Sequence, residues 1–296
     1  MSKVKSGRAK IISFINMKGG VGKTTLTVNL ALEIPKLENK KILIIDIDPQ
    51  FNTTQSILNK YGLLDSYFEY QESKKTIVSV FENKKRPYLA QGTPVDETVL
   101  PVIDLDEKIS LIPGDLDLTN EIEATRADRL KTYLVEKDLI NTYDLIFIDC
   151  PPTWSLYSQA ALKASHSFVV PSRIDEFSLY GIKILLQKLI DILPSNSDLT
   201  CLGVIYTMIS ETRSVVGINK KQMDNKKKIE DFFEELRTAG FEIEINPFTT
   251  TTSFYDRLSY ESIIYSDYDS KKPEVYSEIS DLAREFLSKI GGGEHE

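Results

Sequence analysis

The 296-residue sequence has few of the residues that build disulfides or histidine-based catalytic sites: it has two cysteines and two histidines. Cys150 and Cys201 lie in or beside apolar runs typical of buried strands, so we expect free thiols in a reducing cytoplasm rather than a disulfide. With only His166 and His295 available, neither a Ser-His-Asp triad nor a histidine-rich metal site is expected. We interpret His166, which precedes a strand-like run, as a loop or core residue.

The sequence also lacks a long apolar run. The basic start "MSKVKSGRAKIISF" is followed only by a short strand-like segment, so we predict neither a signal peptide nor a membrane span and expect a cytoplasmic protein. The net charge of -8 argues against a protein whose whole surface binds nucleic acid. A nucleic-acid interface would therefore require a local basic patch.

Short β-branched and aromatic runs alternate with helical patterns along the chain. This alternation predicts an α/β fold of the P-loop NTPase type, with a doubly wound, mostly parallel sheet and helices on both faces. We expect one domain over residues 1–290 and a flexible tail, "GGGEHE", over 291–296. The expected strands are 10–16, 41–48, 108–114, 143–150, 167–173, 202–208 and 241–247. The expected helices are 23–33, 54–61, 116–137, 156–164, 178–193, 219–239 and 272–290, with an irregular connection over 61–106.

The stretch "NMKGGVGKTTLTVNL" (residues 16–30) places three glycines and two lysines ahead of an apolar helical pattern. Glycines let successive backbone NH groups turn toward phosphate oxygens, and the following helix adds the positive end of its dipole. Lys23 would bind the β and γ phosphates of a nucleotide, and the Thr24 hydroxyl would bind Mg2+. Met17 stands where the standard GxxxxGK motif has glycine. The segment therefore predicts a phosphate loop with one deviation.

Three aspartates close two of the expected strands. Asp149 ends "LIFIDCPP", where a carboxylate can hold Mg2+ through its bound water. Asp46 and Asp48 end "ILIIDIDPQ" at alternate positions, so their side chains should project to the same side. Because ligands of such sheets bind at the carboxyl ends of the strands, we expect the three carboxylates to meet beside the phosphate loop. Because no lone histidine or glutamate offers a strong base, hydrolysis would rely on positioning water and on neutralising phosphate charge.

These segments resemble the deviant Walker A, Walker A′ and Walker B motifs of the ParA/MinD family of partitioning and positioning ATPases. The matching stretches are "KGGVGKTT" (18–25), "LIIDIDPQFNTT" (43–54) and "YDLIFIDCPP" (143–152). The likeness continues through 109–118, 164–182 and 203–208 and weakens after Ile218. The family's loop reads KGGxGK followed by Thr or Ser, which accounts for Met17 and for the first lysine. One departure is Phe51, where many relatives have glycine.

The resemblance implies an ATPase that forms a homodimer around ATP and hydrolyses it slowly until an adaptor protein stimulates turnover. Lys18, matching the signature lysine, would reach the partner's nucleotide, where its charge offsets the phosphates only in the closed dimer. Asp48 would orient the attacking water and, with Asp46, Asp149 and Thr24, support Mg2+. The expected nucleotide contacts are Lys18, Gly19, Gly20, Val21, Gly22, Lys23, Thr24 and Thr25, with Met208, Pro247 and Phe248 near the adenine.

The last helical stretch and the N-terminus bear on which partner such an ATPase would use. The segment "SEISDLAREFLSKI" carries three acidic residues against Arg284 and Lys289, so it lacks the basic face of a lipid-binding helix. We therefore do not expect the membrane association of MinD-like proteins. Only residues 1–9 precede the first strand, so we do not expect a helix-turn-helix that reads a specific DNA sequence.

A local excess of basic charge suggests non-specific DNA binding by the ATP-bound dimer, which needs only phosphate contacts and would place the protein on the nucleoid. A solvated helix face is the alternative interpretation. The candidate DNA-binding residues are Arg213, Lys220, Lys221, Lys226, Lys227 and Lys228.

Other functions share parts of this motif set. A bacterial tyrosine autokinase would use clustered tyrosines, and Tyr255, Tyr260, Tyr265, Tyr268 and Tyr276 occur late in the chain. An iron-sulfur relative of the nitrogenase iron protein would need exposed cysteines or a CxxC pair. A non-hydrolysing scaffold would not need Asp48 and Asp149. The cargo, whether a plasmid, a chromosome, a carboxysome or a chemosensory cluster, has no signature in the sequence.

Overall fold

The computed structural model describes residues 8–81, 100–119, 126–209, 220–240, 243–253, 263–268 and 273–291. Within these ranges one seven-stranded sheet has the order β3-β4-β2-β5-β1-β6-β7. All neighbouring strands are parallel except β3, which is antiparallel to β4. The strands are β1 Lys10–Phe14, β2 Ile42–Asp46, β3 Ile103–Asp104, β4 Ile109–Ile112, β5 Leu145–Asp149, β6 Ser167–Arg173 and β7 Thr200–Thr207.

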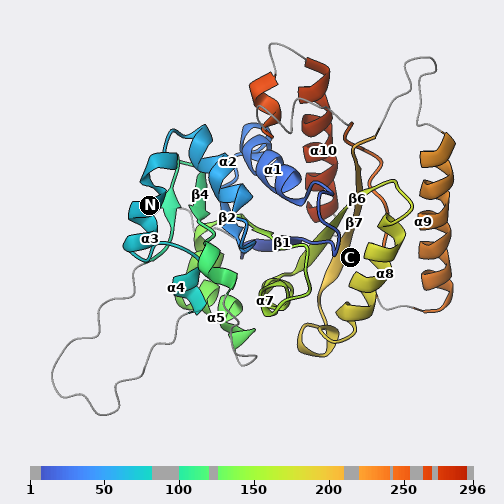
Figure 1. Cartoon of the computed structure of the whole chain (residues 1–296), viewed down its shortest axis with the longest axis horizontal. Coiled ribbons are helices and arrows are strands. Elements are labelled where there is room, and N and C mark those ends of the chain that lie inside the picture. The colour runs from blue at the N-terminus through green and yellow to red at the C-terminus, as the bar shows by residue number, and fades with distance from the viewer. Residues whose placement is uncertain are drawn as a thin grey trace.

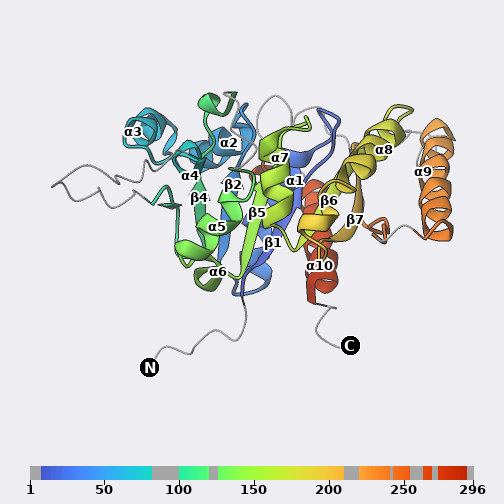
Figure 2. The ribbon, with the colours of Figure 1, turned by 90° about the horizontal axis from the view of Figure 1, so that it is seen from below.

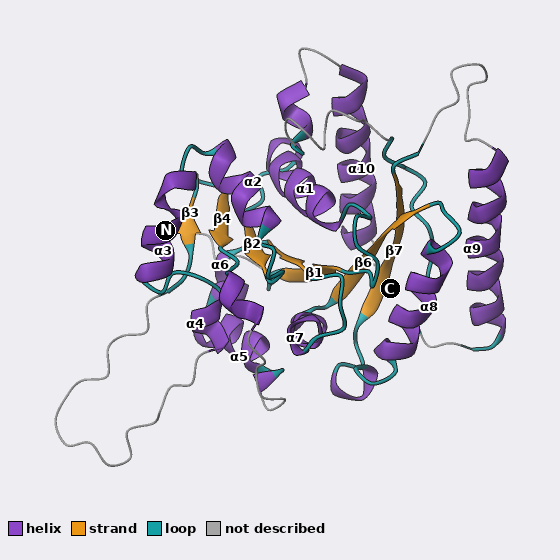
Figure 3. Cartoon of the chain, viewed as in Figure 1, coloured by secondary structure: helices purple, strands orange, loops and turns teal. Residues whose placement is uncertain are grey.

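Helices cover both faces of this sheet (Figure 1, with the elements coloured by type in Figure 3). The α-helices are α1 Lys23–Leu37, α2 Asn52–Lys60, α3 Tyr67–Glu72, α4 Val78–Phe81, α5 Arg129–Glu136, α6 Leu139–Thr142, α7 Leu156–Ala164, α8 Ser178–Leu189, α9 Lys220–Thr238 and α10 Pro273–Gly291. Short 3-10 turns are η1 Leu64–Ser66, η2 Leu116–Thr119, η4 Leu193–Ser195 and η6 Tyr265–Tyr268. The expected doubly wound fold is confirmed.

Alternating strand residues build two separate cores. In β1, Ile12 and Phe14 pack with α1, α2 and α10 on one face, whereas Ile11 packs with α5, α7 and α8 on the other. The central strands β2 and β5 are buried at every position, as parallel strands covered on both faces must be. The sheet therefore holds the carboxyl ends of its strands as a fixed platform.

Two expected elements differ from the structure. Residues 243–253 form no strand; they run beside β7 with isolated parallel bridges from Val204 to Pro247 and from Ile209 to Ser253. At the first of these bridges the Val204 NH donates to the Asn246 carbonyl and the Phe248 NH donates to the Val204 carbonyl, so the bonds to β7 come from the residues on either side of Pro247. The expected helix over 116–137 is divided between η2 and α5. Residues 241–242 and 120–125 lie outside the described ranges, and the short strand β3 was not expected.

The outer edge of the molecule beyond β7 is formed by α8 and α9. Figures 1 and 2 both place α9 beyond α8 at this end of the sheet. Ile229 and Phe233 of α9 are buried in the core that also contains Leu185 and Leu189 of α8. None of the described helices is both long enough and apolar enough to span a lipid bilayer.

Candidate phosphate-binding site

The loop between β1 and α1 has the backbone that a phosphate cradle requires. Gly20 and Gly22 have φ of 66° and 89°, a left-handed conformation that side chains disfavour. The Thr207 hydroxyl at the end of β7 donates to the Val21 carbonyl at 2.9 Å, and the loop is also fixed by Asn16, whose side chain accepts from the Lys18 NH at 3.1 Å. The Asn16 amide also donates to the Pro171 carbonyl in β6 at 2.8 Å, so the loop is anchored to β6 and to β7.

Lys23 is buried at the start of α1. Its Nζ donates to the Lys18 carbonyl at 3.2 Å. Burial lowers the pKa of this amine, although the nearby Asp149 and Asp48 carboxylates oppose the shift. A desolvated ammonium beside backbone NH groups is suited to binding an anion, because an anionic ligand would restore the solvation that burial removed.

Asp149 is the most informative residue of the site. Its Oδ2 accepts from the hydroxyls of Thr24 and Thr53, each at 2.7 Å, whereas its buried Oδ1 has no hydrogen-bond partner among the described residues. Burial raises the pKa of Asp149 to about 6, against the opposing effects of the two hydroxyls and of Lys23. A buried carboxylate oxygen without a partner carries a desolvation cost that a bound cation would remove.

The donor set fits Mg2+ better than a metal that needs a closed protein cage. No cluster of three or more His, Cys, Asp or Glu side chains arranged for metal binding occurs among the described residues. Mg2+ commonly takes one or two protein ligands and completes its shell with water and phosphate oxygens. Asp149 and Thr24 would supply such a partial shell.

Asp46 and Asp48 both lie beside Asp149, as the sequence predicted. Asp46 is level with Asp149 in the β2–β5 register and is fully buried. Its Oδ2 accepts from the Thr54 NH at 2.8 Å and the Thr54 hydroxyl at 2.7 Å, and its Oδ1 accepts from the Asp48 NH at 3.2 Å. Burial and the charge of Asp149 hold the pKa of Asp46 well above its usual value. Asp46 therefore organises the segment that carries Asp48.

Asp48 follows β2, two residues beyond Asp46. Its side chain is nearly buried, and its Oδ1 accepts from the Gln50 NH at 3.0 Å. The charge of Asp48 acts on both Lys23 and Asp149, raising the pKa of each. Three carboxylates, two hydroxyls and one buried ammonium thus converge at the carboxyl ends of β1, β2 and β5.

Lys18 is held within its own chain. Its Nζ lies 2.6 Å from both Oδ1 and Oδ2 of Asp175, in the turn between β6 and α8. Burial would raise the pKa of Asp175, but the bonds from Lys18 and from the Ser178 hydroxyl hold it below its usual value. The Lys18 side chain remains 24% exposed, so the ion pair lies at the mouth of the site.

Comparisons with known proteins agree with this geometry. A family described as an AAA domain matches residues 9–201. The sporulation initiation inhibitor protein Soj of Bacillus subtilis (strain 168) is 32% identical over 212 residues, which cover 71% of this chain and 76% of Soj. The chromosome partitioning protein ParA of Myxococcus xanthus (strain DK1622) is 30% identical over 211 residues, which cover 70% of this chain and 67% of that protein. This chain belongs to the ParA family of partitioning ATPases.

Solved structures share the fold. The apo McdA structure from Cyanothece has a TM-score of 0.70 and 20% identity, covering 94% of this chain and 99% of McdA. Cobyrinic acid a,c-diamide synthase from Mycobacterium smegmatis, solved with an ATP analog and magnesium, has a TM-score of 0.67 and 20% identity, covering 96% of this chain and 97% of the synthase. The fold of these two proteins is thus shared over nearly the whole chain.

Of the three residues predicted near the adenine, only Met208 lies at the end of β7. Phe248 is buried in the core, where its ring stacks on Phe286 of α10 at 6.3 Å and its NH donates to Val204 in the middle of β7. Phe248 therefore does not lie at the strand end where it was expected. Pro247 forms a bridge with Val204, also in the middle of β7. The segment runs parallel to β7 and reaches the carboxyl end of the strand only near Thr252, whose NH donates to the Tyr206 carbonyl.

The predicted DNA-binding lysines lie at one end of α9, and Arg213 lies outside the described residues. Lys226 is turned inward: it pairs with Glu230 at 3.6 Å and lies over the Tyr206 ring. The second half of the helix is acidic. The exposed lysines of the first half are Lys220, Lys221, Lys227 and Lys228.

Sequence reasoning missed several residues that complete the site. Thr53 lies within the second motif and Asp175 within the stretch "PSRIDEF", so both stood in segments already matched to the family. The sequence analysis also did not assign Asn16, which begins the loop, or Thr207, which ends β7. Their hydroxyl, amide and carboxylate groups were visible as residue types, but only the folded sheet shows which oxygen or nitrogen each one contacts.

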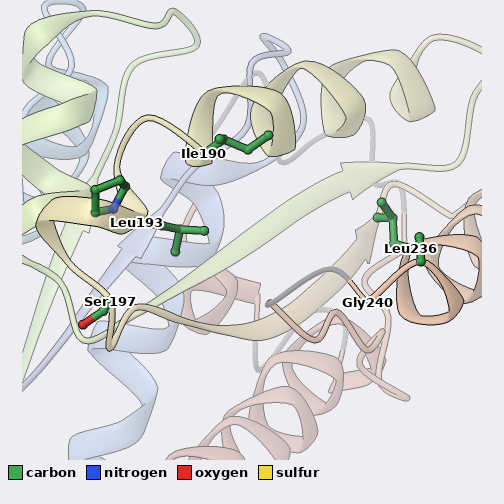
Figure 4. Close-up of a pocket in the computed structure, with 7 residues that line it drawn as sticks. Ile190, Leu193, Ser197, Leu236 and Gly240 are labelled. Carbon is green, nitrogen blue, oxygen red and sulfur yellow. The ribbon is translucent and has the colours of Figure 1, made fainter.

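The structure also contains an apolar pocket of about 600 Å3 between the ends of α8 and α9 (Figure 4). Ile190, Leu193 and Pro194 line one side of it, and Leu236 and Ala239 line the other. Among the described residues that line this pocket, none is an aspartate, glutamate, lysine or arginine. These residues offer no charged group for phosphate or metal binding, and the pocket is separate from the phosphate-binding site.

Proposed function

We propose that this chain binds ATP with Mg2+, forms a dimer around the nucleotide and hydrolyses it to position or segregate a cargo on DNA. The observation that carries the proposal is the buried Oδ1 of Asp149, which lacks a partner among the described residues, next to the buried Lys23. The Asp149 carboxylate is suited to binding a cation and the Lys23 ammonium is suited to binding an anion. Mg2+-ATP would supply both.

Each site residue then has a defined task. Lys23 and the loop NH groups of residues 18–25 would hold the phosphates, while Thr24 and Asp149, with support from Asp46, would hold Mg2+. Bound Mg2+ would neutralise charge on the transferred phosphoryl group. Asp48 would orient the attacking water, since its carboxylate lies close enough to Lys23 and Asp149 for its charge to act on both. Without a stronger base, hydrolysis would be slow until an adaptor stimulates it.

The surface beside Lys18 supports dimer formation. Phe177, Tyr180 and Ile184 are 69%, 63% and 47% exposed, and their spacing places them on one face of α8. The Lys18 ammonium lies 6.0 Å from the centroid of the Phe177 ring. A second copy covering this apolar face would bring its phosphates close to Lys18, which would then exchange Asp175 for the partner's nucleotide.

The exposed lysines of α9 support non-specific DNA binding. Lys220, Lys221, Lys227 and Lys228 form a positive end on an otherwise acidic chain, and a dimer would present two such ends. DNA binding that depends on ATP would place the protein on the nucleoid. An adaptor of the ParB type, or another cargo adaptor, would then couple hydrolysis to movement of a plasmid, a chromosome or a protein organelle such as a carboxysome.

Two alternative functions are less consistent with the contacts. A MinD-like membrane role would need an apolar helix face for lipid, but Ile279, Leu282 and Phe286 of α10 are buried in the core with α1. A tyrosine autokinase role would need accessible tyrosines, but Tyr265 is buried and the Tyr276 hydroxyl donates to Glu33. Tyr255 and Tyr260 lie outside the described residues.

The test measures three properties of the full-length chain with Mg2+ and ATP. We expect phosphate release, a shift from monomer to dimer in sedimentation velocity with a non-hydrolysable ATP analog, and retention of that dimer on random-sequence DNA at moderate salt. ADP is the matched control and should give neither dimer nor DNA retention. A chain that binds no ATP would contradict the whole proposal. An ATP-bound dimer that does not bind DNA would contradict only the proposed DNA binding.

A further inference from the structure

The backbone of Phe51 is strained. Phe51 has φ 40° and ψ 36°, in the left-handed region, immediately before α2 and three residues after Asp48. Glycine adopts this conformation freely, whereas a residue with a Cβ does so at a cost in free energy. Such strain persists only where surrounding contacts hold it, and it concentrates at functional sites.

The contact that holds Phe51 is an aromatic stack on Tyr67 of α3. The two ring centroids lie 5.1 Å apart and the ring planes differ by 2°. Tyr67 is buried, and its hydroxyl donates to the Gly114 carbonyl at 3.2 Å, just after β4. A Cβ built on Gly114 would lie 2.9 Å from the Cβ of Phe51 and 2.9 Å from the Asp46 Cγ. The partly buried Phe51 therefore contacts Tyr67 through its ring and lies close to Gly114 at its Cβ.

The strained residue closes the turn that carries Asp48. The Phe51 NH donates to the Asp48 carbonyl at 2.8 Å, and the Gln50 NH donates to the Asp48 carboxylate at 3.0 Å. On its other side, the Phe51 carbonyl accepts from the Gln55 NH at 3.0 Å in α2. A change in the φ and ψ of Phe51 would move Asp48 relative to α2 and to the phosphate loop.

We propose that the stacked pair of Phe51 and Tyr67 positions Asp48 for hydrolysis, so that the pair sets the rate of turnover rather than the affinity for nucleotide. Neither ring touches the phosphate loop in the described contacts, so both act through Asp48 as positioning residues. The inference rests on the proposed function, because it assumes that Asp48 acts in ATP hydrolysis. It also explains how a phenylalanine can occupy a left-handed position suited to glycine.

Four variants of the full-length chain test the proposal. Phe51→Leu and Tyr67→Leu remove the stack from either side. Tyr67→Phe keeps the stack and removes only the bond to Gly114. Phe68→Leu is a matched control, because Phe68 also contacts the Tyr67 ring but is 70% exposed. Each variant is measured for kcat and KM of basal ATP hydrolysis, and for hydrogen exchange of the peptide spanning residues 44–55.

We expect kcat to fall by about tenfold in Phe51→Leu and Tyr67→Leu, with KM unchanged, because a small displacement of Asp48 slows the reaction without weakening phosphate binding. Hydrogen exchange over residues 44–55 should be faster in both. Tyr67→Phe and Phe68→Leu should match the wild type. The double variant of Phe51→Leu and Tyr67→Leu should be no slower than the slower single variant, because both remove one contact.

An unchanged kcat in both leucine variants, with wild-type hydrolysis intact, would overturn the proposal. An equal loss in Tyr67→Phe would also overturn it, because the hydroxyl rather than the stack would then be responsible. If Phe51→Leu is poorly folded, Phe51→Tyr restores a ring and should recover kcat. A wild-type chain that does not hydrolyse ATP would contradict the proposed function instead, and hydrogen exchange would then still report whether the stack holds the turn.

Discussion

The Lys18 ammonium lies 2.6 Å from both carboxylate oxygens of Asp175 in the same chain. The proposed dimer requires this lysine to contact the partner's nucleotide, so the ion pair with Asp175 competes with dimer formation. Asp175 Oδ1 also accepts from the Phe177 NH at 3.0 Å and from the Ser178 hydroxyl at 2.9 Å at the start of α8. Opening the ion pair would thus leave Asp175 with partners of its own.

Asp175→Asn should therefore strengthen ATP-dependent dimerisation. Asparagine keeps an oxygen for the Phe177 NH but removes the charge that holds Lys18. Because the two side chains are 24% and 34% exposed, the pair contributes little, and the dimer should tighten by no more than about fivefold. Sedimentation equilibrium with a non-hydrolysable ATP analog measures the change. Weaker dimerisation in this variant would show that Asp175 itself contributes to the interface.

Asp48→Ala should keep ATP-dependent dimerisation and lose turnover, because in the proposed mechanism the residue orients water rather than holding phosphate. We expect kcat to fall by at least about 100-fold. Single-turnover hydrolysis and sedimentation velocity, run on the same preparation, separate the two properties. Hydrolysis at the wild-type rate would remove Asp48 from the mechanism.

Lys18→Ala and Lys23→Ala should fail at different steps. Lys23 is buried in the phosphate loop of its own chain, so its loss should weaken ATP binding by the monomer. Lys18 lies at the mouth of the site, so its loss should spare ATP binding and weaken the dimer. Titration of a fluorescent ATP analog at low protein concentration reads the first property, and analytical ultracentrifugation reads the second. Equal loss of monomer binding in both variants would contradict the division of roles.

The double substitution of Lys227→Glu and Lys228→Glu should weaken DNA retention without changing ATP hydrolysis. If both lysines contact phosphates, the slope of log affinity against log salt should fall by about 0.9 per lost contact. The matched control replaces Lys41 and Lys131, two exposed lysines, by glutamate; α5, which carries Lys131, lies well away from α9, toward the other end of the sheet (Figure 1). Equal loss in the control would mean that only net charge matters.

Glu285→Gln should destabilise the protein at neutral pH and not at low pH. Burial would raise the pKa of Glu285, but bonds from the NH groups of Thr249 and Thr250, each at 2.8 Å, hold it below its usual value. A carboxylate whose folded pKa is lowered stabilises the fold above its unfolded pKa, about 4.3, and loses this effect as pH falls through the lower folded pKa. At pH 7 the Tm of the variant should lie a few degrees below that of the wild type, because its free energy of unfolding falls by about 1 kcal/mol. A difference that persists at pH 3 would point to packing instead.

Much of the fold follows from local patterns. The apolar run closed by Asp149 predicted β5, and the runs over 156–164 and 167–173 match α7 and β6 at both ends. In β5, burial on both faces leaves no polar residue before Asp149, so the strand pattern is clear. The segment over 241–247 looked similar in sequence, but its described part pairs with β7 only through an isolated bridge at Pro247.

The candidate site divides in the same way. The sequence by itself determined the phosphate loop, Lys23 and the three strand-end aspartates, because each is a residue type at a fixed spacing from a strand or helix. Only the tertiary structure decided that Asp149 keeps one oxygen without a partner among the described residues, that Lys18 pairs with Asp175, and that Phe51 stacks on Tyr67. Those relationships join residues from different strands and helices, and their distances exist only once the sheet sets the register and brings the strand ends together.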